Sequence, residues 1–397
     1  MPSIHLAAYT MTSALGAGLA PTLAALREQR SGVRAMRWET VDLETCLGAV
    51  DGLDDYVLRP DLAAFDCRNN RLAQLGLEQD GFAATVREAI ARHGADRVGV
   101  FLGTSTSGIL SSELAYRHRD PVTGAFLTPL DYRHTHNSYS VADFVRTYFG
   151  LSGPAFVVST ACSSSAKVFG NAQRMMDCGL IDAAIVGGVD SLCLTTLYGF
   201  NSLQLVSRRP CRPFDAARDG ISIGEAAAFV LVERVREPAP GAIVMSGIGE
   251  SSDAHHMSSP HPEGLGARTA MEQALAMAGL QPAQIDYINL HGTATPSNDA
   301  AEDKAVCALF GTDTPSSSTK GHTGHTLGAA GGIEAVICAL ALQQGLAPGG
   351  CGTEELDPKL NTRYLLANRE MPLQHVLSNS FGFGGSNCSM VLSKVAA

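Results

Sequence analysis

Four short segments of this sequence hold residue types that could carry out covalent chemistry, and the first surrounds a cysteine. In residues 157–166, VVSTACSSSA, a strand-like run leads through small residues to Cys162 and then into a predicted helix. The exposed N–H groups and the dipole of a helix N-terminus favour a thiolate, which could accept an acyl group from a thioester. Taken alone, the segment fits a buried structural cysteine at least as well, because small residues before a helix also permit tight packing.

The second segment, residues 289–302, places a histidine where a predicted strand ends. His291 is followed by Gly-Thr-Ala-Thr-Pro, a sequence typical of a loop. An imidazole at the end of a strand can point into a cleft and serve as a hydrogen-bond donor or a base. A structural histidine is the alternative interpretation.

The third segment, residues 318–334, combines a lysine with two histidines before a helix rich in glycine and alanine. Lys320 near His325 would favour the neutral imidazole and help to fix its orientation. Glu334 could lie on the following helix and pair with Lys320. The glycine–alanine run also predicts close helix packing.

The fourth segment, residues 379–387, embeds Phe383 among glycines. Aromatic residues in such a setting are typical of a mobile gate, with backbone N–H groups free to bind an oxyanion. An ordinary tight turn is the alternative.

The elements that must position these residues alternate between short apolar runs and longer helical patterns, which predicts an α/β fold with largely parallel sheets covered by helices. A proline-containing seam at residues 237–241 divides the chain into 1–236, which carries the cysteine, and 237–397, which carries the histidines. The predicted strands are residues 98–102, 156–158, 183–186, 227–232, 285–290 and 389–392. The predicted helices are residues 22–27, 141–149, 165–178, 267–278, 300–309 and 333–344.

Composition restricts the classes of function. Hydrophobic residues make up 45% and charged residues 17% of 397 residues, which suits a large core and an oligomer. The net charge of −10 disfavours nucleic acid as a partner. No apolar run of 18 residues predicts a membrane span, and the first residues do not resemble a signal peptide, so a cytoplasmic protein is expected. The ten cysteines form no C-x-x-C pair, and no nucleotide-binding glycine motif is present.

The four segments, in this order, resemble the elongating β-ketoacyl-(acyl carrier protein) synthases of fatty acid and polyketide synthesis. Residues 212–220 and 253–260 extend the agreement, which runs from about Gly16 to Leu392. The resemblance implies the thiolase fold, in which two similar halves stack as α-β-α-β-α layers. It also implies a dimer, either of identical chains or with a related ketosynthase or chain-length factor.

The resemblance also implies a mechanism. Cys162 would take the acyl group, while His291, His325 and Lys320, with Glu334 in support, would serve the decarboxylation of malonyl thioester. No metal or redox cofactor is expected, because the substrates are carried on the phosphopantetheine of acyl carrier protein. His322 matches no motif position.

Four further sets of residues follow from family position. Phe383 would supply the gate and an oxyanion N–H, and Thr293 and Thr295 would contact the pantetheine arm. Thr106 and Phe200 would line the acyl pocket, whose far end the partner's residues 134–137 would close. That polar lining predicts a functionalised, conjugated or short acyl chain. The expected contacts with the acidic carrier protein are Arg68, Arg71, Arg208 and Arg209.

Two alternative functions remain open. A catalytically silent chain-length factor typically lacks the nucleophile, so Cys162 argues against it. A coenzyme A thiolase would use a second cysteine late in the chain, and Cys388 falls outside the expected pattern. The identity of the acyl chain and the pathway stay open.

Overall fold

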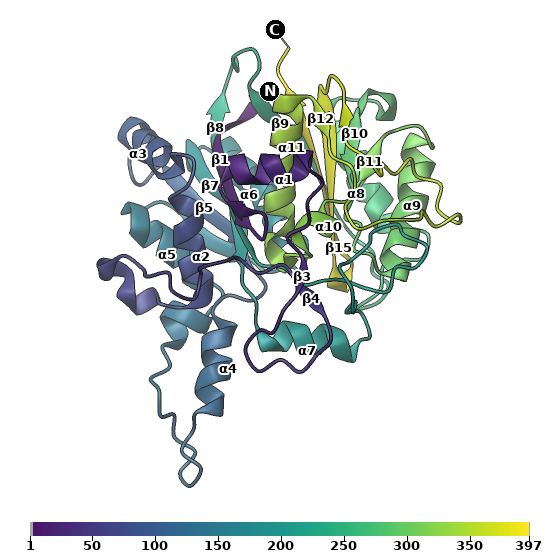
Figure 1. Cartoon of the computed structure of the whole chain (residues 1–397). Helices are drawn as coiled ribbons and strands as arrows, with labels where there is room; N and C mark the ends of the chain where they lie inside the picture. The colour runs from purple at the N-terminus through teal and green to yellow at the C-terminus, as the bar shows by residue number, and fades with distance from the viewer. Residues whose placement is uncertain (1–2, 397) are drawn as a thin grey trace.

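The computed structural model describes residues 3–396 and contains two groups of five strands with the same pairing pattern (Figure 1). In the first group, β5 (Val98–Gly103) is parallel to β6 (Ala155–Val158) and β7 (Ala183–Asp190), while β8 (Ala226–Val235) is antiparallel to β7 and to β1 (Ser3–Ser13). In the second, β10 (Tyr287–Asn289) is parallel to β11 (Ser316–Ser317) and β14 (His375–Gly382), while β15 (Ser386–Lys394) is antiparallel to β14 and to β9 (Ile243–Ser252). A short pairing of β1 with β9 joins the two groups.

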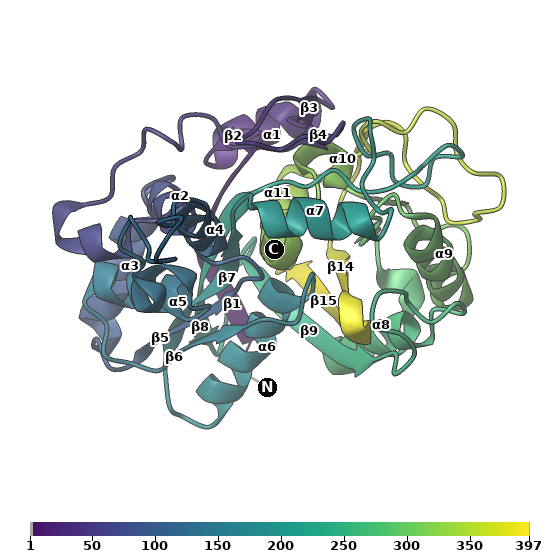
Figure 2. The ribbon, with the colours of Figure 1, turned by 90° about the horizontal axis from the view of Figure 1, so that it is seen from below.

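Helices cover both groups of strands and also separate them. Between the groups lie α6 (Ser164–Asp177) and α11 (Ala330–Gln344). Outside the first group lie α2 (Arg68–Leu77), α3 (Phe82–His93) and α5 (Ser140–Phe149), and outside the second lie α8 (Leu265–Ala278) and α9 (Pro296–Phe310). This order gives five layers, as Figures 1 and 2 show from two sides. The remaining helices are α1 (Leu19–Arg27), α4 (Ile109–Arg117), α7 (Leu194–Ser202) and α10 (Lys320–Thr323).

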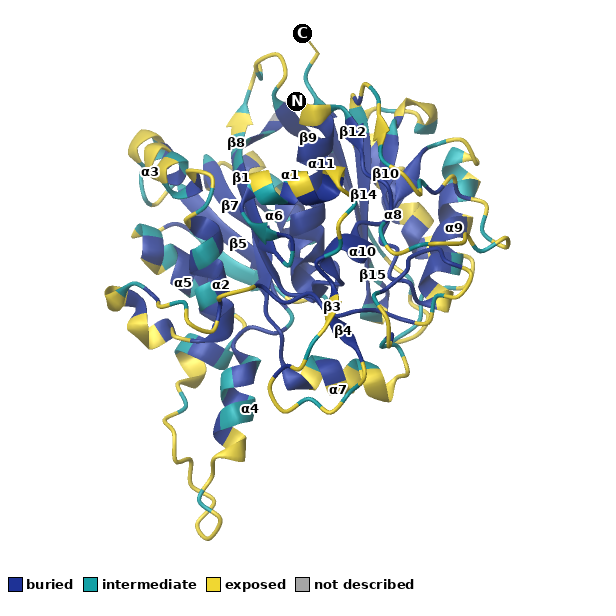
Figure 3. Ribbon diagram, viewed as in Figure 1, coloured by how far each residue is buried: buried dark blue, intermediate teal, exposed yellow. Residues whose placement is uncertain are grey.

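The central helix α11 is apolar around most of its circumference, as expected for a helix buried on all sides. Figure 3 shows it in the dark blue interior. A Cβ at Gly331 would lie 2.7 Å from the Cβ of Ala166 on α6, so glycine allows the two central helices to touch. The stretch Leu327–Gln344 has the length and hydropathy of a membrane span, but 89% of it is buried in the fold.

All six predicted strands and all six predicted helices are present, with ends that differ by a few residues. Among the longer elements, the predictions did not include β1, β9 and β14, nor the helices α2, α3, α4 and α7. In β9, Gly247 and Gly249 weaken the strand signal. A Cβ at either position would lie 2.0–2.1 Å from a carbonyl oxygen of α8, so close packing requires glycine there.

Candidate active site

The thiol of Cys162 sits on a sharp turn between β6 and α6. Ala161 has φ 54°, a left-handed conformation that costs a non-glycine residue roughly 1 kcal/mol or more. The hydroxyl of Ser164 fixes the turn by accepting from the N–H of Thr160 at 2.9 Å and donating to the carbonyl of Ala161. Cys162 is 5% exposed. The turn therefore presents the sulfur at the start of α6, inside the molecule.

His291 follows the carboxyl end of β10 and is held through its own backbone. The carboxylate of Glu302, on α9, accepts from the N–H groups of His291 and Gly292 at 2.8 and 2.7 Å. The side-chain amide of Asn379, on β14, donates to the same carboxylate at 3.0 Å. Burial raises the pKa of Glu302 to about 7, against the opposing effect of these three donors. Glu302 thus positions His291 without facing the thiol.

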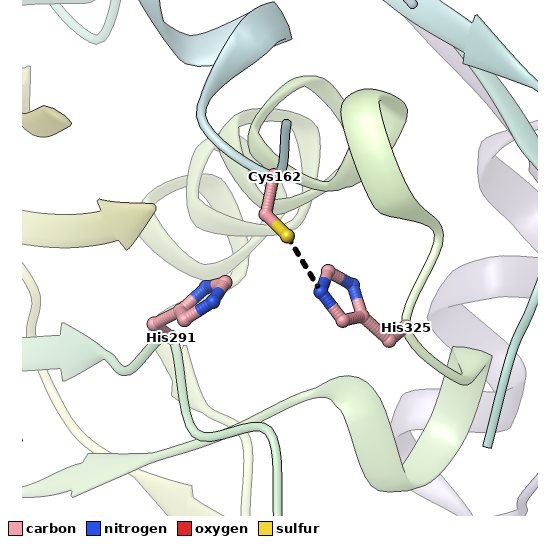
Figure 4. A group of neighbouring side chains, drawn as sticks. All are labelled: Cys162, His291 and His325. Atoms are coloured by element: carbon pink, nitrogen blue, oxygen red, sulfur yellow. Dashed lines mark hydrogen bonds between the residues drawn. The ribbon is translucent and has the colours of Figure 1, made fainter. Parts of the chain in front are cut away.

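His325 lies between α10 and α11, with its ring beside the sulfur (Figure 4). Its Nδ1 accepts from the N–H of Leu327 at 3.3 Å, so the ring proton resides on Nε2. That Nε2 is 3.0 Å from the Sγ of Cys162. His325 therefore aims an N–H at the position of the thiol.

Lys320 fixes the tautomer of His291, as the N–H of Leu327 fixes that of His325. Its Nζ donates to the Nδ1 of His291 at 3.3 Å and to Glu334 at 2.5 Å. A lysine ammonium only donates, so the proton of His291 must reside on Nε2. The ammonium thus contacts His291 and not His325, whose orientation it was expected to fix.

Both histidines are neutral donors. Burial lowers the pKa of His291 and of His325 well below the usual range, and the charge of Lys320 lowers both further. The pairing of Lys320 with Glu334 was predicted from sequence and is present in the structure. A ring nitrogen of each histidine and the sulfur lie within 4.8 Å of one another, so the two imidazoles could together stabilise a negative oxygen beside the sulfur.

The resting thiol is protonated, which differs from the thiolate that the helix N-terminus favours. Burial raises the pKa of Cys162 to about 11, although Lys320 and the backbone N–H of Phe383, which points at the sulfur, act in the opposite direction. Desolvation thus raises the pKa of the thiol by more than the helix N-terminus lowers it. The same Phe383 N–H is placed to bind an oxyanion that forms near the sulfur.

Two cavities reach Cys162 from different sides. The first, an entrance channel, passes Thr293 and Thr295 to reach the histidines and the sulfur. The second, of about 210 Å³, is lined by Ser105, Ser159, Ala161, Thr196 and Leu327. Phe200, on α7, and Phe383 line both cavities, with ring centroids 5.4 Å apart. The two cavities meet at this aromatic pair, and the second, here called the inner cavity, also opens to the surface at the exposed Ser159.

The three central residues also have the spacing of metal ligands. The ligand atoms of Cys162, His291 and His325 lie within 4.8 Å of one another. The ammonium of Lys320 touches His291, and a second cation beside it would be repelled. We therefore interpret the cluster as a site for acyl chemistry. His322 is fully buried near this site, lines neither cavity, and has a pKa that burial lowers to about 4.

Thr106 does not line the inner cavity. Its hydroxyl donates to the buried carboxylate of Asp190 at 2.7 Å, and its backbone N–H donates to the same oxygen. Ser105, one residue earlier, takes the place on the wall. The prediction for Thr106 is therefore wrong, because the loop after β5 turns its side chain toward Asp190.

Residues 134–137 have partners within the chain. His134 bonds to Asp131 at 2.7 Å, and His136 bonds to the hydroxyl of Ser112 at 2.6 Å. These groups are satisfied without a polar substrate, so the physical argument for a polar acyl pocket no longer rests on them.

The four candidate carrier contacts differ in exposure. The side chain of Arg68 is 7% exposed and forms an ion pair with the buried Glu225, so it holds α2 to the core and the carrier-contact prediction for it is wrong. Arg71 is partly exposed and pairs with Asp66. Arg208 and Arg209 are exposed, a few residues after Leu205, which lines the entrance channel.

Sequence reasoning assigned no role to Glu302, Asp190, Ser105 or Thr196. Glu302 stands in the segment that contains His291, and its spacing of 11 residues gave no sign that it would accept the histidine's backbone N–H. Asp190 follows the glycine pair of β7. The only sign in the sequence was the pair of glycines nearby, which indicates that other parts of the chain pack closely against the backbone there.

Comparisons with known proteins agree with this geometry. The family descriptions "Beta-ketoacyl synthase, N-terminal domain" and "Beta-ketoacyl synthase, C-terminal domain" match residues 1–237 and 242–354. A mitochondrial 3-oxoacyl-[acyl-carrier-protein] synthase of Arabidopsis thaliana is 38% identical over 62% of this chain, and that match spans 58% of its own length. The 3-oxoacyl-[acyl-carrier-protein] synthase 2 of Coxiella burnetii is 36% identical over 76% of both proteins.

Solved structures extend the likeness to the whole chain. A structure of a ketosynthase in complex with its chain length factor, from Xenorhabdus doucetiae, matches 99% of this chain at 40% identity with a TM-score of 0.89. A beta-ketoacyl synthase from Burkholderia phymatum matches all of it at 27% identity with a TM-score of 0.88. The five layers are those of the thiolase fold, as the sequence predicted.

Proposed function

Because this chain belongs to the beta-ketoacyl synthase family, we propose that it is a condensing enzyme that extends an acyl chain held on Cys162, by decarboxylative condensation with malonyl-acyl carrier protein. The observation that carries the proposal is that a ring nitrogen of each histidine lies within 4.8 Å of the sulfur of Cys162, with the Nε2 of His325 at 3.0 Å. Such donors stabilise an oxyanion. An acyltransferase needs that, and a structural thiol does not.

The first half-reaction moves the acyl group. The Sγ of Cys162 attacks the carrier thioester, the C–S bond to pantetheine breaks, and the thiol proton passes to the departing pantetheine sulfur. The N–H groups of Cys162 and Phe383 hold the oxyanion of the tetrahedral intermediate. The acyl chain then occupies the inner cavity beyond Phe200 and Phe383.

The second half-reaction forms the carbon–carbon bond. The malonyl thioester loses CO₂, and the charge that develops on its thioester oxygen is met by His291 and His325, while Thr293 and Thr295 contact the pantetheine arm. The enolate carbon attacks the acyl carbonyl, and Cys162 leaves as thiolate. A proton from solvent then restores the thiol of Cys162, and the β-ketoacyl chain remains on the carrier. Loss of CO₂ drives the bond formation, so this scheme needs no metal or redox cofactor.

We further propose that a chain length factor is the partner subunit. The similarity to the Xenorhabdus doucetiae complex, at 40% identity over 99% of the chain, supports this choice over a homodimer. The edge strand β6 offers unpaired backbone on one side, and its four residues are only half-buried, so it could accept a strand from the partner. The presence of Cys162 supports the catalytic role over that of the silent partner.

We propose that the acyl chain is short, conjugated or functionalised. Ser105 and Thr196 place hydroxyl groups on the wall of the inner cavity beside Cys162. The cavity opens to the surface at the exposed Ser159, so a partner subunit would set its length. Specialised polyketide or polyene synthesis fits such a chain.

Three finer assignments complete the proposal. Arg71, Arg208 and Arg209 are proposed to contact the acidic carrier protein. The chain is proposed to consist of two halves, residues 1–236 and 237–397, and to act in the cytoplasm. All ten cysteines are free, as expected in a reducing compartment.

The test is the intact mass of the enzyme after incubation with carrier proteins that bear a panel of acyl groups. Cys162 should gain the mass of short or conjugated chains before that of palmitoyl. Adding malonyl-carrier should then release the label as a β-ketoacyl product. Acylation at another residue, or none with any carrier, would contradict the proposed function.

A further inference from the structure

Three histidines lie beside the outer end of the entrance channel, in the loop of residues 253–263. His255 and His256 are exposed and His261 is half-buried, and the rings of His255 and His261 are 5.1 Å apart. Ser258, Ser259 and Pro260, which lie between them in sequence, line the channel itself. None of the three imidazoles lines the channel, but they flank these lining residues in sequence and are much more exposed than Cys162, so they lie toward its surface side.

Two of these imidazoles have a defined tautomer. The Nδ1 of His256 accepts from the N–H of Ser258, and the Nδ1 of His261 accepts from the N–H of Glu263, each at 3.2 Å. A nitrogen that accepts an N–H carries no proton, so Nε2 is the donor in both rings. Within residues 3–396, neither Nε2 donates to another group.

The loop is fixed, and its carboxylates are engaged. The carbonyl of Met257 accepts from the N–H of Gly384 at 2.8 Å, which holds the loop against the glycines around Phe383. Asp253 accepts from Asn387 at 2.9 Å, and Glu263 pairs with Lys304 at 2.6 Å. Asp253, which also lines the channel, and Glu263 are thus held by other groups, and within residues 3–396 no side chain accepts from the Nε2 atoms of His256 and His261.

We propose that His255, His256 and His261 bind the phosphodiester of the incoming phosphopantetheine arm. The proposal rests on the proposed function, because it takes the thioester end of the arm to Cys162. The phosphate is at the opposite end of the arm, so it comes to the outer end of the channel, where the histidines lie. Hydrogen bonds from N–H donors to a charged phosphate are stronger than those between neutral groups.

The test compares two small acyl thioesters, hexanoyl-pantetheine and hexanoyl-4′-phosphopantetheine, with no carrier protein present. The rate of Cys162 acylation is measured by intact mass, and the readout is the ratio of the two second-order rates. In the unaltered protein, the phosphate should increase the rate at least about tenfold. In His255→Ala/His256→Ala/His261→Ala, the ratio should fall to about one.

Two control variants make the result specific. His118→Ala removes an exposed histidine that lies away from the channel, and it should keep the full ratio. His256→Gln/His261→Gln keeps an amide donor near the position of Nε2 and should retain most of the ratio. Because each variant serves as its own reference, partial misfolding changes both rates and leaves the ratio intact.

Three outcomes would overturn the inference: no phosphate preference in the unaltered protein, a preserved ratio in the triple variant, or an equal loss in His118→Ala. The proposed function fails in a different way. In that case neither thioester would acylate Cys162 at all, whereas acylation by both at equal rates would reject only the phosphate site.

Discussion

The two halves share one strand-pairing pattern, yet the loops at corresponding strand ends do different work. After β6, the first half presents the nucleophile Cys162, and after the corresponding β11 the second half presents Lys320 and His325. After β10, the second half presents His291, whereas the corresponding loop after β5 turns inward to Asp190. Two groups of strands with the same pairing thus present the proposed nucleophile from one half and the proposed charge-stabilising groups from the other.

The two halves also differ in the role of a buried carboxylate. Asp190 accepts from Thr104, Ser105, Thr106 and, across the halves, from Gly328, so it serves only to hold loops together. Glu334 in the second half instead balances the charge of Lys320, which contacts the imidazole of His291. The first half therefore supplies a rigid platform and the second supplies the electrostatics.

The largest expected effect tests whether condensation and decarboxylation depend on different halves of the protein. Cys162→Ala should reduce condensation by about 10⁴-fold or more, because no acyl-enzyme can form. Decarboxylation of malonyl-carrier should persist, because its donors lie in the second half. The measurement pairs β-ketoacyl product with release of labelled CO₂, and the exposed Cys178→Ala is the matched control. Loss of both reactions in Cys162→Ala would contradict this division of roles between the two halves.

The next effect tests the electrostatics of the second half. Lys320→Met should lower the free energy of unfolding by about 3–5 kcal/mol, because Glu334 is left as an unpaired buried charge. Lys320→Met/Glu334→Gln should recover much of that stability. Decarboxylation should remain slow in both variants, since neither orients His291. Equal stabilities for the single and double variants, measured by denaturant unfolding, would argue against the ion pair as the cause.

The third effect is a pH dependence of the free energy of unfolding, and it comes from Glu302, the carboxylate that holds the backbone of His291. The folded pKa of Glu302, about 7, is above the usual value for glutamate, so the folded protein holds this proton more tightly than the unfolded chain. Its contribution to stability is full below about pH 4 and is lost as the pH rises through 7, by about 3 kcal/mol. Glu302→Gln cannot titrate and should lack that decline. Unfolding of both proteins between pH 4.5 and 8 measures the difference, and parallel curves would contradict it.

The smallest effect concerns the two imidazoles. His291→Ala or His325→Ala should slow malonyl decarboxylation by about 100-fold or more, the effect of losing one oxyanion donor. Acyl transfer to Cys162 should suffer less, because the N–H groups of Cys162 and Phe383 serve that step. His118→Ala provides the control. If labelled CO₂ is released at the unaltered rate in both variants, the second half does not have the role assigned to it.

A structural feature could be predicted from the sequence where its signal lies in neighbouring residues. The strands and helices that flank the four segments were predictable, because apolar periodicity and glycine-rich ends are properties of neighbouring residues. Strand β9 was missed because Gly247 and Gly249 are required by close packing against Ala274 and Ala270 of helix α8, which lie 27 and 21 residues further along the chain. The errors at Thr106 and Arg68 have the same origin, since each side chain turned toward a distant buried carboxylate.

The sequence by itself determined the residue types of the site, Cys162, His291, Lys320 and His325, and the α/β class of the scaffold. Only the tertiary structure decided which imidazole the lysine touches, which nitrogen of each ring carries the proton, and whether the thiol is charged. Residue types are written in the chain. The tautomer of His325 depends on the nearby N–H of Leu327, but the contact of its Nε2 with the sulfur and the pairing of Lys320 with Glu334 join residues 163 and 14 positions apart, and folding alone brings those together.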